Sequence, residues 1–504
     1  MNLEDIQQLA GDAKVFPRSI RSVDGEIFAF AKHRMQHYLL IVFNPQMPAL
    51  HHSKFSGEVQ DLDTTTAIKW CLPNRQNAEK LRVLFPFTAP QVLGLKKSFG
   101  AGDRLGLAAP AHIRAARACD ESGIALILAQ QSIREMTRTQ RTPDLVLDAA
   151  TWGSFQEGYE EAWGADADHL KTEDDIRNMV KAGFTFFTID PSDFVDNHVA
   201  EYSADALNEQ FAQLKDGEKL AAIYRNQSFA VQSDNGETTE IHFSEDEFAR
   251  AAVKYSRAVT HTVKLAQLLT ELKGEGNFDL EMSVDETDSP TTVAEHYFVA
   301  NELRNRGVKL TSLAIRFVGE FQKGIDYIGD LSEFEARLKE HVTIAKVLGP
   351  YKISVHSGSD KYSVYPICGE VCGDLLHVKT AGTWYLEAIR TAARCDVSLF
   401  REICAFAEAR FMTDRATYHV AEDLSDLPDY KNRDDNQLEE LFDNNTFRQM
   451  LHVTFGSVLT DKTENGAWRF RSRLYEMWAK YEDVHLEIIQ KYSGLHLKTL
   501  GWCR

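Results

Sequence analysis

Eight short apolar segments, each followed by an amphipathic helical pattern, constrain the fold of this chain more than any other feature. Several segments show little polar alternation, which is typical of parallel strands covered on both faces. They are Ser98–Leu107, Ile124–Gln130, Gly164–His169, Phe184–Asp190, Phe278–Asp285, Leu313–Val318, Lys352–His356 and Leu375–Lys379. Eight such units in series predict an α/β fold of the (β/α)8 TIM-barrel class rather than an open doubly wound sheet.

Helix start and stop signals support this order of elements. Thr172 and Asp175 have the spacing of a capping box, and Gly183 can end the helix that they begin. Further along, Asp288-Ser289-Pro290 supplies an N-cap residue and a proline suited to the first helical position. We therefore expect one helix to begin near residue 172 and another near residue 289.

The barrel pattern occupies residues 91–395. One segment within this range and the two ends of the chain do not follow the pattern. Residues 1–90 contain short alternating runs and predict a small β-rich N-terminal addition. Between Asp190 and Phe278 lie nearly ninety residues, where one crossover needs far fewer, so a helical insertion is expected at 200–276 after the fourth strand, with a turn at Asp234-Asn235-Gly236. Residues 396–504 are charged and helical in pattern, which indicates a helical C-terminal extension.

The charge of the chain limits its partners. The 75 acidic residues exceed the 56 Lys and Arg residues, giving a net charge of −19, which argues against nucleic acid or an anionic membrane as the main partner. No apolar run approaches the ~20 residues that span a bilayer, and the acidic start does not resemble a signal peptide. Seven scattered cysteines suggest reduced thiols in a cytoplasmic protein. We expect a small-molecule substrate; the oligomeric state stays open.

The active site of a (β/α)8 barrel lies at the carboxyl ends of its strands. By this rule His169, Glu320 and His356, which follow the third, sixth and seventh strands, are candidate metal ligands. Two imidazoles and one carboxylate suit a divalent transition metal that acts as a Lewis acid. Such a set accepts Mn, Fe, Co, Ni or Zn, so the sequence leaves the identity of the metal open. The alternative is that these residues bind no metal, as most histidines do not.

Two acids, one at a strand end and one earlier on its strand, are candidates for proton transfer. Asp168 is either a general acid or base beside the metal, or a loop acid at the start of the helix near Thr172. Glu281 occupies an inward strand position by two-residue alternation. An acid there either takes part in catalysis or pairs with an interior cation such as Arg316 or Lys352.

The segment from His356 to Lys361 is a glycine- and hydroxyl-rich loop after the seventh strand. TIM barrels often bind an anion there through backbone N–H groups and a nearby cation, so Ser357 and Lys361, with Lys379 at the end of the eighth strand, are candidate substrate-binding residues. The alternative is a plain loop with a solvated lysine. Residues 100–106 contain three glycines in the manner of a dinucleotide-binding loop, but no acid follows the next strand, which favours a tight turn.

Six segments together resemble the tagaturonate/fructuronate epimerase family. They are FGAGDRLGLAAPAHIRA (99–115), WGADADHLKT (163–172), FTFFTIDPSD (184–193), EMSVDET (281–287), FVGEFQKGIDY (317–327) and HSGSDKYSVYP (356–366). The resemblance covers roughly residues 90–400 and implies a metal-dependent TIM-barrel isomerase of hexuronate breakdown. It implies Asp168 as proton acceptor, Glu281 as proton donor, and His169, Glu320 and His356 as metal ligands. Asp190, Asp285 and Glu286 are the obvious substitutes.

The implied reaction constrains the mechanism. Tagaturonate and fructuronate differ at one alcohol carbon placed β to the ketone, whose C–H is not acidified, so simple enolisation does not invert it. Metal-assisted retro-aldol cleavage and recapture, with two acid/base groups, is the hypothesis. The alternatives are another metal-dependent keto-sugar isomerase or aldolase, a (β/α)8 glycoside hydrolase that uses the carboxylates, or a non-catalytic sugar-binding protein. Turnover of neutral ketohexoses stays open.

Overall fold

The computed structural model describes residues 3–119, 123–232, 236, 238–418, 420 and 423–503. Eight parallel strands close into a barrel in the order β10-β13-β14-β15-β16-β7-β8-β9. All eight strands expected from the sequence form, which confirms the TIM-barrel class. Their bounds are β7 Ser98–Gly100, β8 Ala125–Ser132, β9 Trp163–Leu170, β10 Phe186–Ile189, β13 Asp279–Val284, β14 Ser312–Ile315, β15 Lys352–Val355 and β16 Leu376–Lys379.

Helices follow every barrel strand and cover the outside of the barrel. They are α3 Ala109–Ala118, α4 Ile133–Thr139, α5 Pro143–Glu157, α6 Glu173–Ala182, α9 Glu245–Lys273, α10 Val293–Asn305, α11 Leu331–Leu348, α12 Tyr365–Cys372 and α13 Thr383–Cys395. Helix α6 begins at the Thr172 capping box and ends at Gly183, as expected. The expected start near residue 289 is wrong: Thr292 and Glu295 form the capping box of α10, while the Ser289 hydroxyl accepts a hydrogen bond from Lys254.

The side chains of the barrel strands that point outward are apolar, and many of those that point into the barrel are polar. Leu280, Met282 and Val284 of β13 alternate with Asp279, Glu281 and Ser283, and all six are buried. The apolar set packs against the helices, whereas the inward acids have lost water and need partners inside the barrel. Asp279 finds them at the amino end of the barrel, where its carboxylate accepts backbone hydrogen bonds from Leu93 and Gly94 at 2.8 and 3.0 Å.

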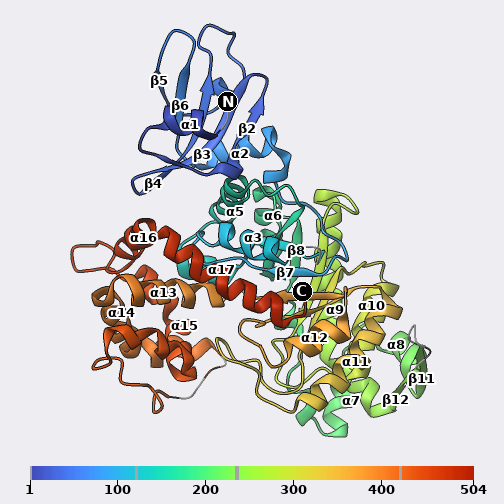
Figure 1. Cartoon of the computed structure of the whole chain (residues 1–504). Helices are drawn as coiled ribbons and strands as arrows, with labels where there is room; N and C mark the ends of the chain where they lie inside the picture. The colour runs from blue at the N-terminus through green and yellow to red at the C-terminus, as the bar shows by residue number, and fades with distance from the viewer. Residues whose placement is uncertain are drawn as a thin grey trace.

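The N-terminal addition is an antiparallel sheet that packs on the helical layer of the barrel (Figure 1). Its order is β1-β3-β4-β6-β5, with β2 paired to β3. Phe30 of β3 stacks on Trp152 of α5 at a ring separation of 5.5 Å, within an apolar cluster that joins the two parts. The elements are α1 Leu3–Ala10, β1 Lys14–Val15, β2 Arg21–Val23, β3 Glu26–His33, β4 Gln36–Phe43, β5 Glu58–Asp61, β6 Ala67–Cys71 and α2 Arg75–Leu84.

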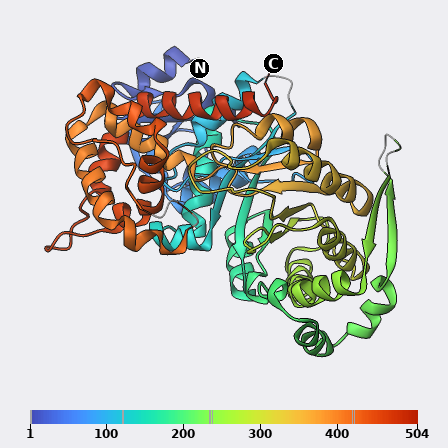
Figure 2. The ribbon, with the colours of Figure 1, turned by 90° about the horizontal axis from the view of Figure 1, so that it is seen from below.

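Two further groups of elements flank the barrel. The segment after β10 contains α7 Ala204–Ala212, α8 Gly217–Tyr224 and the hairpin of β11 Gln227–Gln232 with β12 Thr238–Phe243. Figure 2 shows this hairpin, in green, at one end of the molecule and the orange C-terminal helices at the other. The expected turn at 234–236 lies mostly outside the described residues. The C-terminal helices are α14 Val397–Asp414, α15 Asn445–Thr460, α16 Arg471–Lys480 and α17 Glu482–Thr499. The domain boundaries proposed from the sequence stay a prediction.

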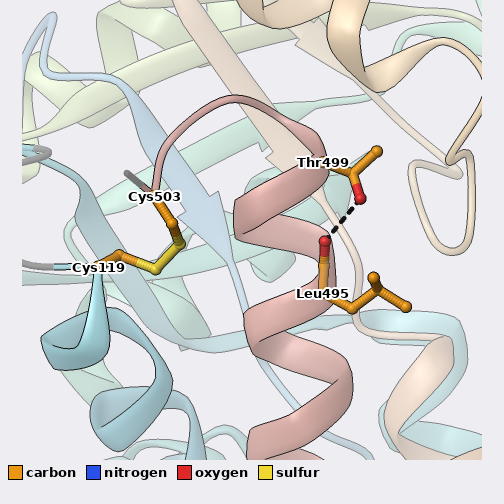
Figure 3. The surroundings of a disulfide bond; sticks show 4 residues. All are labelled: Cys119, Leu495, Thr499 and Cys503. Carbon is orange, nitrogen blue, oxygen red and sulfur yellow. Dashed lines mark hydrogen bonds between the residues drawn. A yellow bond between two sulfur atoms is a disulfide. The ribbon is translucent and has the colours of Figure 1, made fainter.

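The last helix returns to the barrel. Helix α17 packs against α3 and α13, and Cys503 beyond its end forms a disulfide with Cys119 at the end of α3 (Figure 3). The expectation of reduced thiols is therefore wrong for this pair, which sequence spacing did not reveal because 384 positions separate the two residues. No helix in the described ranges is long and apolar enough to cross a membrane.

Glu482 fixes the start of α17 to the N-terminal sheet. Its carboxylate oxygens lie 2.7 Å from Lys32 Nζ and 2.9 Å from His37 Nε2. Burial alone would raise the pKa of Glu482, but the hydrogen bond with His37 and the charge of Lys32 outweigh burial and lower the pKa from 4.5 to about 2. The ionised carboxylate therefore stabilises the fold.

A pH titration of stability tests this contact. The pKa of Glu482 is lower in the folded state than in the unfolded state, so its ionised carboxylate adds to the free energy of unfolding. This contribution is complete above pH 4.5 and is lost as the pH falls toward about 2. The contribution is about 3 kcal/mol at neutral pH. We expect Glu482→Gln to lower the free energy of unfolding in urea at pH 7 and to match the wild type more closely as the pH falls toward about 3. Exposed Glu464→Gln is the control; equal pH dependence in both variants would contradict the account.

Candidate active site

A buried ammonium group holds three carboxylates together at the carboxyl ends of the barrel strands. Lys379 Nζ, at the end of β16, lies 2.9 Å from Asp166 and 2.7 Å from Asp168, both on β9, and 2.8 Å from Glu281 on β13. The hydroxyl of Thr188 on β10 is a fourth oxygen neighbour at 2.8 Å. The structure thus brings the two predicted proton-transfer acids to one cation.

The three carboxylates differ in protonation because their surroundings differ. Burial raises the pKa of Asp166 to about 7, against the opposing charge of Lys379 and with the support of its acidic neighbours. Burial also acts on Asp168, but the charges of Lys379 and His169 outweigh it and hold the pKa of Asp168 well below its usual range. Lys379 and His356 likewise hold the pKa of Glu281 well below its usual value. The cluster therefore carries an ionised Asp168 and a readily protonated Asp166 near neutral pH.

Two imidazoles lie beside this cluster. The ring centres of His169 and His356 are 5.1 Å apart, and each ring contacts acids. His356 Nε2 lies 2.6 Å from Glu281 and its Nδ1 3.2 Å from Asp285, while His169 Nδ1 lies 3.2 Å from Asp190. His169 has φ +53°, in the left-handed region that is uncommon for residues other than glycine and is often found at functional sites.

The donor atoms of two groups of residues are close enough to hold a metal ion. Asp168, His169 and His356 each offer one ligand atom within 4.8 Å of the others, and His169, Asp190 and Glu286 form a second group. Imidazole nitrogens with carboxylate oxygens fit a divalent transition metal, and a carboxylate on the far ring nitrogen of His169 is the usual outer partner of a metal-binding histidine.

Glu320, the third predicted ligand, belongs to neither group among the described residues. It follows β14 in a short bridge with Ile328, and its carboxylate accepts a hydrogen bond from Gln322 at 2.7 Å. Its role as a ligand stays a prediction, and Asp168 takes its place in the arrangement that the structure brings together.

The predicted substrate-binding residues have different surroundings. Ser357 accepts a hydrogen bond from Lys323 and lines the pocket above the cluster, as does Lys379. Lys361 is fully buried and donates to the backbone carbonyls of Gln322, Ile325 and Ser359. Its ammonium therefore holds two loops together, and a contact of Lys361 with substrate stays a prediction.

The pocket also receives residues to which the sequence assigned no role, although Arg104 is a polar residue at the end of the first predicted strand. Arg104 reaches it from the loop after β7, while Tyr418 and His452 come from the C-terminal helical region. That loop is tight: a Cβ at Gly102 would lie 2.2 Å from the backbone oxygen of Gln130, so only glycine fits. Asp166 was missed as well, although two-residue alternation from Asp168 along β9 places both acids on the inward face.

Comparisons with known proteins identify the family of this chain. A sequence profile of the tagaturonate epimerase (UxaE) family matches residues 16–500. A tagaturonate/fructuronate epimerase of Thermotoga maritima is 44% identical over 431 residues, which is 86% of each chain. The glycerol-complexed crystal structure of the fructuronate-tagaturonate epimerase UxaE from Cohnella laeviribosi is 35% identical, covers 99% of both chains and superposes with a TM-score of 0.91. The native crystal structure of the same enzyme has the same TM-score. The chain therefore belongs to the tagaturonate epimerase family.

Proposed function

We propose that this protein is an isomerase that interconverts D-tagaturonate and D-fructuronate by inverting the alcohol carbon C4. The observation that carries the proposal is the contact of both Asp168 and Glu281 with the Lys379 ammonium, at 2.7 and 2.8 Å. Asp168 and Lys379 line one pocket together with the two imidazoles, and Glu281 is buried next to it. The inversion of an alcohol needs a base for the outgoing proton and an acid for the incoming one, and this cluster supplies both.

A divalent metal fits the proposal. His169 and His356 would hold the ion, with Asp190 orienting the ring of His169, and Glu320 or Glu286 are candidates for a further ligand, which leaves Asp168 as the base. When bound, a divalent cation supplies Lewis-acid stabilisation of negative charge on the ketone oxygen. The donor set is compatible with Mn, Fe, Co, Ni and Zn alike.

The protein residues act on the C4 hydroxyl. Ionised Asp168 removes the hydroxyl proton, the C3–C4 bond breaks, and its electron pair passes into the enolate formed from the ketone. The aldehyde fragment turns, the enolate attacks its other face to re-form the C3–C4 bond, and Glu281 protonates the new C4 alkoxide. Atoms and charges balance, because one proton leaves the substrate and one returns.

The cluster contains a source for the returning proton. Asp166, with a pKa of about 7, is partly protonated at neutral pH, and the Thr188 hydroxyl lies 3.0 Å from Asp166 and 3.2 Å from Glu281. The Thr188 hydroxyl therefore links Asp166 to Glu281 as a path for one proton, which ionised Glu281 would pass on to the C4 alkoxide, a much stronger base than either carboxylate. Lys379 keeps the acids in place and is a positioning residue in this scheme.

An epimerisation assay tests the proposal. Purified protein, stripped of metal by a chelator, is mixed with either keto-uronate, and the products are followed by NMR while Mn, Co, Ni and Zn are added back separately. We expect interconversion only after metal addition. Folded protein that gives no interconversion with any of these metals or Fe would contradict the proposal, and full activity without metal would contradict the role of the ion.

A cytoplasmic location remains part of the proposal. The names of the relatives describe enzymes of keto-uronate metabolism, and we propose that this protein acts on the same metabolites inside the cell. The Cys119–Cys503 disulfide points the other way, since disulfides persist mainly in oxidising compartments. Fractionation of the native source, with the redox state of this pair measured in each fraction, decides between the two.

A further inference from the structure

A wall of nitrogen donors formed by Arg104, Lys323 and His452 lines the pocket beside the carboxylate cluster. The three residues come from the loop after β7, the loop after β14 and helix α15 of the C-terminal region. Arg104 and His452 are 4% and 1% exposed, so both side chains have lost nearly all contact with bulk water. A buried cation with hydrogen-bond donors to spare is a favourable place for an anionic group.

Arg104 is held rigidly, yet one of its nitrogens has no partner. Its Nε lies 2.8 Å from the Glu135 carboxylate, and its guanidinium stacks on the Phe455 ring at 3.8 Å from the ring centre. Its Nη1 is buried and makes no hydrogen bond within the described chain. An unmet buried donor is costly, and an acceptor on a bound ligand removes that cost.

His452 adds a second unmet nitrogen beside Arg104. Its Nε2 lies 3.5 Å from Arg104 Nη2, and its Nδ1 is buried with no hydrogen bond in the described ranges. Burial, together with the surrounding cations, keeps the pKa of His452 well below its usual value, so the ring is neutral. The Nε2 atom of this neutral ring faces the Arg104 guanidinium, which can only donate, so Nε2 is the acceptor. The single ring proton is therefore on Nδ1, which makes Nδ1 a donor.

Lys323 completes the wall with a charge that no acid balances directly. Its Nζ donates to Ser357, and across the described residues it forms no ion pair. Arg134 also lines the pocket but is 40% exposed in its side chain and already pairs with Glu286 at 3.1 Å. The buried donors that remain available are therefore those of Arg104 and His452, with Lys323 nearby as a charge.

We propose that Arg104, with Lys323 and His452, binds the carboxylate of the substrate and sets the preference for uronates over neutral ketohexoses. This inference rests on the proposed function. The two classes of sugar differ only in a carboxylate against a CH2OH group at the same carbon. Lys379 is a poorer partner for this carboxylate, because four oxygens within 2.9 Å already surround its three N–H donors.

Inhibitor pairs that differ only at this carbon test the assignment. The probes are the hexonate obtained by reducing the ketone of tagaturonate and the neutral hexitol of the same configuration. Wild-type protein, Arg104→Gln and Arg104→Lys are compared by titration calorimetry. In Arg104→Gln we expect the Kd of the hexonate to rise about 10- to 150-fold while that of the hexitol stays within about threefold; Arg104→Lys falls between.

A matched control separates binding from stability. Arg141 is a partly buried arginine near the same loop, but it donates to Asp103, Gln131 and Leu145 outside this pocket. Arg141→Gln is expected to lower the thermal midpoint without changing the ratio of hexonate to hexitol affinity. If Arg104→Gln does not fold, Lys323→Gln and His452→Gln are expected to reduce the same ratio.

The outcomes are distinct. Equal loss of affinity for both probes in Arg104→Gln overturns the assignment. So does a ratio of hexonate to hexitol affinity that stays at the wild-type value in Arg104→Gln, Lys323→Gln and His452→Gln. A wild-type protein that prefers the hexonate, loses this preference in Arg104→Gln and yet fails the epimerisation assay contradicts the proposed function and leaves the carboxylate site standing.

Discussion

Replacement of Asp168 by asparagine is expected to lower kcat about 100- to 10,000-fold. Asparagine keeps the shape of the side chain and a hydrogen-bond acceptor for Lys379, but it does not take the proton of the C4 hydroxyl. Lys379 retains Asp166 and Glu281 as partners at 2.9 and 2.8 Å, so the fold is expected to persist. Glu281→Gln is expected to act similarly, because it removes the group that we propose returns the proton.

The measurement is steady-state turnover in both directions, followed by NMR with metal present, beside thermal unfolding of each variant. Asp193→Asn is the control, since Asp193 is an acid with a 67% exposed side chain that pairs with Lys171 outside the pocket. Near wild-type turnover in folded Asp168→Asn and Glu281→Gln would exclude both residues as the acid/base pair and move attention to Asp166, Asp190 or Asp285.

Replacement of Lys379 by methionine is expected to have the largest effect on stability of any single change at the site. Lys379 is the cation shared by Asp166, Asp168 and Glu281, and removing one partner from a buried charge pair typically costs about 3–5 kcal/mol. Activity is expected to be lost as well, because the two acids no longer keep their positions. The denaturation midpoint in urea measures the first effect.

Lys352→Met is the matched comparison for this variant. Lys352 is an equally buried barrel lysine, but its Nζ donates only to the backbone of Lys96 and the hydroxyl of Ser98, and burial lowers its pKa to about 8. Its removal leaves no carboxylate without an ion-pair partner among the described residues, so the cost is expected to be smaller. Equal destabilisation by the two variants at pH 8 would contradict the role assigned to Lys379.

The pH dependence of Lys379→Met follows from the same charges. Without Lys379 the buried carboxylates have folded pKa values raised above their unfolded ones, so their penalty is present at high pH and is relieved as they protonate. The destabilisation is therefore expected to shrink between pH 8 and pH 5. A constant penalty over this range would indicate that lost packing, rather than unpaired charge, is responsible.

Periodicity predicted the barrel but not every helix start. The eight strands follow from apolar runs because each must be covered on both faces. Before α10, Ser289 and Thr292 are alternative N-cap residues. Thr292 caps the helix, because its side chain accepts from the backbone of Glu295 and the Glu295 side chain accepts from the backbone of Thr292. Ser289 instead accepts a hydrogen bond from Lys254. Such competition is decided by tertiary contacts that lie outside the local sequence.

The candidate site was predictable only where it lies on the strands. The rule of strand ends pointed to Asp168, His169 and His356, which line one pocket. Two-residue alternation pointed to Glu281, which contacts His356 and Lys379 next to that pocket. His452 was not predictable, because no spacing relates a helix near the C-terminus to a barrel mouth formed hundreds of residues earlier.

Cys119 and Cys503 were unpredictable for the same reason, being paired across 384 positions. Lys379 illustrates a different limit, since a lysine at a strand end is compatible with binding substrate or with holding carboxylates. Only its contacts with three acids in the folded structure decide between them.

The central claim is that C4 is inverted by breaking the C3–C4 bond rather than by moving the hydrogen on C4. Competitive ¹³C isotope effects at natural abundance, measured by NMR on partly converted keto-uronate, test it most directly. The account predicts a normal ¹³C effect at both C3 and C4, because both carbons change bonding when the bond breaks. An effect at C4 with none at C3 would contradict it and would indicate transfer of the C4 hydrogen as a proton or hydride.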